Sequence, residues 1–294
     1  MDLLAARTRL AKLERDDRLD DVDNLRGRIS ALNFIAEVVD YVRWRPAEEG
    51  WSTLGPRAEA LRRHLGALNE ELFNALREQI RLGTLPATAL RRRFDACTDY
   101  TPAQKGSIHS GPDRLDVLLD GLLGITAPAA PREPPWPDAL HYEPTPARAV
   151  LDLVDNVGWE SRDVFYDLGS GMGRVVILVH LLTGLPAKGV EIDPILCEQA
   201  RQAARRLNLA SVEFIEANAR ETDYAEGTIF FLFTPFKDST WRAVLDTLYE
   251  ASRQRELKLC TYGPCTLAAV QEPWLASLDG NADHTFKVAL FRSR

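Results

Sequence analysis

The stretch of sequence that decides the fold reads Val164-Phe165-Tyr166-Asp167-Leu168-Gly169-Ser170-Gly171-Met172-Gly173-Arg174. A short apolar run leads into a glycine-rich turn, and an apolar run of helical length follows it. Such a turn presents backbone N–H groups and a helix N-terminus to a ligand at the carboxyl edge of a parallel sheet. Glycine is required because a side chain would block the ligand or forbid the dihedral angles of the turn. The stretch therefore predicts a ligand-binding α/β sheet.

The residues around this stretch alternate between apolar strands and amphipathic helices. We expect one helix to start with Thr145 as its N-cap and Pro146 in its first turn, and to run to Gly158. Further helices are expected at 195–207 and 240–252, and strands at 164–166, 188–192, 212–215, 228–233 and 257–261, with a terminal antiparallel strand at 284–292. This alternation predicts an α/β fold with a doubly wound, mostly parallel sheet covered by helices on both faces.

The first part of the chain has a purely helical pattern. Apolar residues recur at three- and four-residue spacing over 25–42 and 61–80, and a shorter helix starting near Pro112 would bury Leu115, Leu118, Leu119 and Leu122. Five prolines within residues 126–137 forbid a helix and favour an extended connector. We therefore expect three parts, namely an all-helical domain over 1–125, a proline-rich linker over 126–140 and the α/β domain over 141–294.

The composition is that of a soluble globular protein, with 45% hydrophobic and 27% charged residues. No apolar run approaches the roughly 18 residues that span a bilayer, and the first residues lack a signal peptide's apolar stretch. We therefore expect a cytoplasmic protein without membrane contact. The net charge of −7 argues against a nucleic-acid partner. The four cysteines are scattered and complete no zinc spacing, which predicts buried thiols and no metal site.

Two classes of ligand compete for the glycine turn. The dinucleotide fingerprint G-x-G-x-x-G/A needs a small residue three positions after Gly171, and Arg174 stands there. Asp167 would repel a pyrophosphate, whereas an acid suits a ligand with an amino-acid or sulfonium group. Glu191, at the end of the second expected strand, can accept hydrogen bonds from both hydroxyls of a ribose. Asn218 follows the third strand, where a polar side chain can reach an adenine edge.

In this order, these residues resemble the class I S-adenosylmethionine-dependent methyltransferases over residues 142–294. The resemblance implies that S-adenosylmethionine is the cofactor, that Asp167 and the glycine turn hold its methionine end, and that Glu191 holds the ribose. Asn218 would hold the adenine amine; the family usually has Asp there, and Asn keeps one acceptor while adding a donor. The cofactor-binding residues expected are Tyr142, Thr145, Asp167, Gly169, Ser170, Gly171, Gly173, Arg174, Glu191, Ile192, Asn218 and Ala219.

A second motif stands ahead of the glycine turn. Tyr142-Glu143-Pro144-Thr145 fits the Tyr-x-x-Thr element of the non-SET histone-lysine methyltransferases, the disruptor-of-telomeric-silencing type, which the sequence resembles most within the superfamily. The resemblance implies that Tyr142 and Thr145 close over the bound cofactor. Those enzymes place Gln where this chain has Arg174, and they carry an Asn-Asn-Phe motif and a Lys-rich segment that this chain lacks.

Residues 233–236, Phe-Thr-Pro-Phe, follow the fourth expected strand in place of that motif. Thr234 could accept a hydrogen bond from a target amine and Phe236 could stack on it, which makes them the candidate catalytic residues; a purely structural turn is the alternative. Methyl transfer needs little acid–base catalysis, so the lack of an evident general base does not argue against a methyltransferase. We expect transfer to a protein lysine or a small-molecule amine. O- or C-methylation of a small molecule, or a non-catalytic cofactor-binding interaction module, remain alternatives, and acceptor and oligomeric state stay open.

Overall fold

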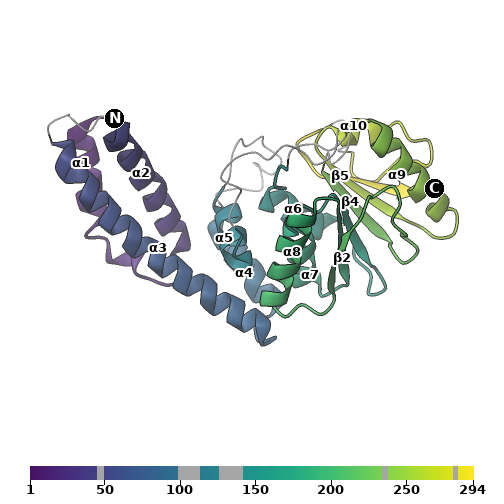
Figure 1. Ribbon diagram of the computed structural model, residues 1–294, viewed down its shortest axis with the longest axis horizontal. Helices are drawn as coiled ribbons and strands as arrows, with labels where there is room; N and C mark the ends of the chain where they lie inside the picture. Colours follow the sequence, from purple (N-terminus) through teal and green to yellow (C-terminus); the bar gives the residue numbers. More distant parts are fainter. Residues whose placement is uncertain (45–49, 99–112, 126–141, 234–237, 281–283) are drawn as a thin grey trace.

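The computed structural model describes residues 1–44, 50–98, 113–125, 142–233, 238–280 and 284–294. A helical region forms the first part of the chain, and an α/β region with a central sheet forms the second (Figure 1). The proline-rich residues 126–140 lie outside the described residues. The division into domains of 1–125 and 141–294 remains a prediction, because the helices of the first part share a core with the sheet, as shown below.

The sheet has seven strands in the order β3-β2-β1-β4-β5-β7-β6. The strands are β1 (Phe165–Leu168), β2 (Ala187–Glu191), β3 (Val212–Glu216), β4 (Ile229–Phe233), β5 (Lys258–Tyr262), β6 (Leu275–Ser277) and β7 (Ala289–Ser293). The first five are parallel, whereas β7 runs antiparallel to both β5 and β6. The predicted fold class is thereby confirmed. The strand order reverses between β1 and β4, which is where an open α/β sheet binds its ligand.

The side chains of successive strand residues point to opposite faces of the sheet. Phe165 and Phe231 pack beneath α6 (Ala147–Asn156), α7 (Arg174–Thr183) and α8 (Pro194–Arg206). Tyr166 and Phe230 point to the opposite face, where α9 (Asp238–Ser252) and α10 (Cys265–Ala269) cover them. A sheet buried on both faces explains why the central strands read as continuous apolar runs.

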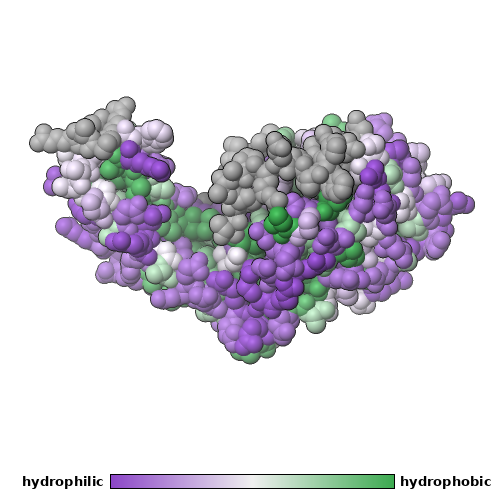
Figure 2. Space-filling view, in the orientation of Figure 1, coloured by the Kyte–Doolittle hydropathy of each residue, from purple (hydrophilic) through white to green (hydrophobic). Residues whose placement is uncertain are grey.

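The helical region consists of α1 (Leu3–Leu13), the 3-10 turn η1 (Asp17–Leu19), α2 (Leu25–Trp44), α3 (Trp51–Arg81), α4 (Ala87–Cys97) and α5 (Arg114–Leu123). Its buried residues fall into two clusters. The first half of α3 packs on α1 and most of α2 and forms a separate hydrophobic core with them. We name this group of helices the arm (residues 1–44 and 50–65). The second half of α3, with α4 and α5, joins the core beneath α6 and α7. The arm therefore stands apart from the sheet (Figures 1 and 2).

Polar contacts reinforce the junction between α4, α5 and the α/β region. The Arg91 guanidinium of α4 binds the Asp155 carboxylate of α6, with Nη1–Oδ1 and Nη2–Oδ2 distances of 2.5 and 2.9 Å. At the C-terminal end of α5, the Arg206 guanidinium of α8 donates a hydrogen bond to the Leu123 carbonyl at 2.9 Å. The helices α4 and α5 are thus fixed to the sheet by apolar packing and by hydrogen bonds.

Several local predictions were wrong in detail. Thr145 is not an N-cap, because α6 begins at Ala147 after Pro146 and has no side-chain cap of its own; it ends at Asn156 and not at Gly158. The last strand begins at Ala289, later than the predicted 284, and the pattern gave no sign of β6 or α10. The four cysteines are free and buried, as predicted.

Candidate cofactor site

The glycine turn leaves β1 at Leu168 and enters α7 at Arg174. Gly169, Gly171 and Gly173 have φ angles of 87°, 52° and 79°, in the left-handed region that other residues avoid. Space is also restricted, because a β-carbon on Gly173 would stand 2.4 Å from Cζ of Phe214. All three glycines are therefore favoured by the backbone conformation, and Gly173 is required by close packing as well.

Asp167 lies in β1 beside this turn and is 3% exposed. No described residue donates a hydrogen bond to its carboxylate. Burial, reinforced by the nearby Glu191 carboxylate, raises the pKa of Asp167 well above its usual value. A buried carboxylate without a partner is costly. A ligand with a positive group next to Asp167 would relieve that cost.

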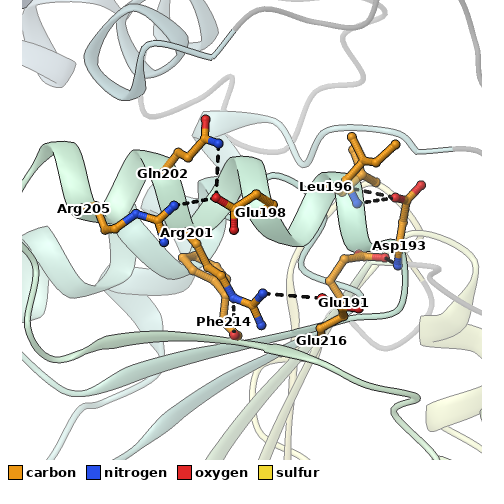
Figure 3. A network of polar contacts seen from close by, with 10 residues as sticks. Glu191, Asp193, Leu196, Glu198, Arg201, Gln202, Arg205, Phe214 and Glu216 are labelled. Atoms are coloured by element: carbon orange, nitrogen blue, oxygen red, sulfur yellow. Dashed lines mark hydrogen bonds and ion pairs between the residues drawn. The ribbon is translucent and has the colours of Figure 1, made fainter.

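Glu191 ends β2 and is 8% exposed. Its Oε2 accepts a hydrogen bond from the Gly171 N–H, and its Oε1 accepts one from the Asp193 N–H, both at 2.8 Å. Burial raises the pKa of Glu191, and these backbone donors oppose the rise. Asp193 in turn caps α8 by accepting from the Ile195 N–H at 2.8 Å (Figure 3). Glu191 therefore ties the end of β2 to the glycine turn on one side and to the start of α8 on the other.

The end of β3 supplies the next predicted residues. Glu216 lies in register with Glu191 and makes an ion pair with Arg201 of α8 at 3.5 Å (Figure 3). The Asn218 side-chain oxygen accepts hydrogen bonds from the backbone N–H of Arg220 at 3.1 Å and from its Nε at 3.2 Å. The acceptor of the Asn218 amide is thus engaged locally, which leaves its amino group as the part able to meet a ligand.

Tyr142 and Thr145 lie where the chain approaches the glycine turn. A β-carbon on Gly171 would meet the Tyr142 ring, so the ring packs directly on the turn. Burial is the main cause that raises the pKa of the Tyr142 hydroxyl above its ordinary value, and the Asp167 and Glu191 carboxylates add to it. Thr145 is buried, with 8% exposure.

Arg174, predicted among the cofactor residues, is the first residue of α7 and has its side chain engaged by α5. The guanidinium is buried and pairs with two carboxylates of α5, Asp116 at 2.5 Å and Asp120 at 2.9 Å. The Arg174 guanidinium is therefore neutralised by α5 directly after the glycine turn. Sequence reasoning missed Asp116 and Asp120, and the sole local signal for Asp116 was its capping-box spacing from Asp113.

The family model described as "Histone methylation protein DOT1" matches residues 141–230, which contain Tyr142, the glycine turn and Glu191. The chain is a class I S-adenosylmethionine-dependent methyltransferase, and its residues 141–230 are similar to the DOT1 family.

Relatives of this methyltransferase resemble about half of its chain. A protein-lysine N-methyltransferase of Saccharolobus islandicus is 27% identical over 153 residues, and the match covers 49% of this chain and 89% of that protein. The crystal structure of an RNA methyltransferase from Salinibacter ruber, in complex with S-adenosyl-L-homocysteine, is 27% identical with a TM-score of 0.39, over 51% of this chain and 92% of that one. A methyltransferase from Thiobacillus denitrificans is 20% identical with a TM-score of 0.33, over 38% and 46%.

The residues of the turn fit S-adenosylmethionine. The buried carboxylate of Asp167 suits the ammonium or sulfonium of its methionine part, and the glycines leave room for it against the backbone. The remaining predicted residues are Ser170, which is buried; Ile192, partly buried after Glu191; and Ala219, buried after Asn218. All three lie at the carboxyl edge of the sheet. The candidate catalytic residues Thr234 and Phe236 lie outside the described residues.

Other kinds of site find no support in the described part of the methyltransferase. No three or more His, Cys, Asp or Glu side chains gather there as a metal ion would need. Among the described helices, none combines the length and the apolar character that crossing a bilayer demands.

Proposed function

We propose that this methyltransferase methylates an amine of a protein, with the lysine side chain as the acceptor. The observation that carries the proposal is the agreement between two independent similarities. The matching family model describes histone methylation proteins, and the Saccharolobus relative is named a protein-lysine N-methyltransferase. The family match includes the segment of Tyr142 and the glycine turn.

In the proposed cofactor site, Asp167 and the glycine turn hold the methionine end of S-adenosylmethionine. Glu191 binds the ribose, and Asn218 binds the adenine. Tyr142 and Thr145 cover the methionine end. Support comes from the position of these residues at one edge of the sheet, with Tyr142 packed on Gly171 and with Glu191 bonded to the Gly171 N–H at 2.8 Å.

When bound, the cofactor supplies a methyl group on a sulfonium, which is a good leaving group. The task of the chain is therefore to align the acceptor with that methyl group and to exclude water. The partly buried Tyr142 ring covers one side of the turn. In the proposal, Thr234 accepts a hydrogen bond from the acceptor amine and Phe236 stacks on that amine, because both residues come directly after β4 in the sequence.

The arm is the second element that we assign to the acceptor. It has its own hydrophobic core and stands apart from the sheet (Figure 1). A small-molecule acceptor would not need a surface so far from the cofactor turn, whereas a protein acceptor could contact both. This separation favours a protein over a small-molecule amine.

Incubation of the protein with methyl-labelled S-adenosylmethionine and fractionated cell extract tests the proposal. We expect label in the protein fraction, on lysine residues that mass spectrometry identifies. The matched control is Glu191→Ala, which should transfer little label because its cofactor site is damaged. Label that enters only small molecules or RNA would contradict the protein acceptor and leave the cofactor site intact.

A further inference from the structure

The charge of Arg174 is balanced by the helical region and not by the α/β region in which Arg174 lies. Arg174 is the first residue of α7, where the helix dipole disfavours a cation, and its side chain is 6% exposed. A buried cation must be paired. Its two partners, Asp116 and Asp120, are one turn apart on α5, at 2.5 and 2.9 Å.

Asp116 binds a second element with the same oxygen. Its Oδ1 accepts a hydrogen bond from the Ala147 N–H at 2.8 Å as well as from the Arg174 guanidinium. Ala147 begins α6, and Thr145 precedes it by two residues. The other oxygen of Asp116 accepts from the Asp113 N–H at 3.0 Å, which closes the N-terminus of α5. One carboxylate therefore joins α5, the end of the glycine turn and the segment that carries Tyr142.

We propose that Asp116 is a positioning residue for the cofactor, which makes α5 a structural part of the cofactor site. Through Arg174 it fixes the end of the glycine turn, and through Ala147 it fixes the segment that places Tyr142 on Gly171. The inference rests on the proposed cofactor site, and it adds to that site a residue from outside the α/β region.

Electrostatics support the same assignment. Two carboxylates face one guanidinium, so the group of Asp116, Asp120 and Arg174 carries a net negative charge when all three are ionised. The cofactor brings a sulfonium and an ammonium to the turn that precedes Arg174. A bare Arg174 cation at that place would repel both, and the pairing with α5 removes the repulsion.

Calorimetric titration of the whole chain with S-adenosylmethionine tests the proposal. Asp116→Asn keeps the shape of the side chain but cannot balance Arg174, and we expect a dissociation constant raised about tenfold or more. In the double variant Asp116→Asn, Arg174→Gln, no buried cation is left unpaired, so stability should recover relative to the single variant while affinity stays low. The matched control is Arg91→Gln, which removes another Arg–Asp pair between the helical and α/β regions, away from the turn, and should leave affinity unchanged.

The outcomes distinguish a failure of the proposed role of Asp116 from a failure of the proposed cofactor site. A double variant that folds and binds like the wild type overturns the role of Asp116, as does an equal loss of affinity in Arg91→Gln. If Glu191→Ala binds S-adenosylmethionine normally, the proposed cofactor site itself has failed.

A measurement on the wild-type protein decides the matter even where the variants do not fold. Amide hydrogen exchange should slow in α5 and at Ala147 when S-adenosylmethionine binds, together with the amides of residues 169–174. Slower exchange at 169–174 with no change in α5 and at Ala147 would overturn the inference.

Discussion

The ring of Tyr142 lies directly against the α-carbon of Gly171, so that a β-carbon there would stand 2.3 Å from the ring atom Cε2. The two residues are 29 positions apart in the sequence, and both belong to the predicted cofactor set. Their contact makes the position of the ring depend on the absence of a side chain at 171.

The first prediction concerns Gly171→Ala. We expect it to displace Tyr142 and to weaken S-adenosylmethionine binding strongly. The matched control is Gly184→Ala, which also places alanine at a positive φ (74° against 52°) but has no atom within 4 Å of the new β-carbon. Both variants should lose about 1–2 kcal/mol of stability from backbone strain. Calorimetric titration should show lost affinity in Gly171→Ala alone, and equal affinities would show that the ring contact is irrelevant.

The second prediction concerns Glu191→Ala, which removes the acceptor of the Gly171 and Asp193 N–H groups. We expect cofactor binding to weaken by about 1.5–3 kcal/mol, the usual cost of losing hydrogen bonds to a charged group. Glu216→Ala is the control, because Glu216 ends the neighbouring strand in register with Glu191 but is exposed. An affinity that falls by the same amount in both variants would place the ribose elsewhere.

The third prediction concerns pH. Burial raises the pKa of Asp120 from 3.8 to about 6; Arg174 opposes the rise, and Asp116 adds to it. Since the unfolded chain releases this proton at lower pH than the folded protein, Asp120 lowers the stability as pH rises from about 4 to about 6. Asp120→Asn does not titrate. Urea unfolding at pH 4, 5, 6 and 7.5 should therefore show the wild type losing stability relative to the variant across that window, and a constant difference would contradict the shift.

The fourth prediction contrasts two glycines inside helices. Gly66 of α3 has no atom within 4 Å of the position that a β-carbon would take, so Gly66→Ala should raise stability by about 0.5–1 kcal/mol through helix propensity. Gly121 of α5 lies against Phe73, and a β-carbon there would stand 2.2 Å from the ring. Gly121→Ala should therefore destabilise the protein. Chemical unfolding measures the free energy of unfolding of both variants. If both variants changed stability in the same direction, the contrast between helix propensity and packing would be contradicted.

The fifth prediction concerns truncation. A chain of residues 138–294 loses α4 and α5, whose apolar residues lie in the same core as α6 and α7. We expect this fragment to be insoluble or to unfold without cooperativity, because it exposes the surface that those helices bury. Soluble fragment with a sharp thermal transition would show that residues 141–294 form an independent domain.

The sequence predicted the parts of the site that follow one another along the chain. The β1 strand, the glycine turn and α7 form a local pattern, and Glu191 and Asp193 occupy the end of the next strand and the cap of the next helix. Three glycines at alternate positions indicate a turn with positive φ angles, and Asp before proline indicates the N-cap of a helix. These signals need no knowledge of the rest of the fold.

Contacts between distant segments could not be predicted in that way. Asp116 and Arg174 are 58 residues apart, and nothing in either neighbourhood indicates that they meet. The same contact explains why the predicted Thr145 cap was wrong, since the N–H of Ala147 already has Asp116 as its acceptor. Likewise, the pairing of Asn218 with Arg220 depends on how the turn after β3 is folded.

The helix α3 belongs to both cores, since its first half packs in the arm and its second half packs beside α5. With 31 residues it is roughly 45 Å long at the usual helical rise. A single helix therefore sets the distance from the arm to the core that α5 shares with α6 and α7. Under the proposed function, an acceptor that contacts both the arm and the cofactor site must match this distance, and we expect α3 to select acceptors by the spacing between their docking surface and the methylated group. Lengthening α3 by two full helical turns would shift the selected spacing without altering either end.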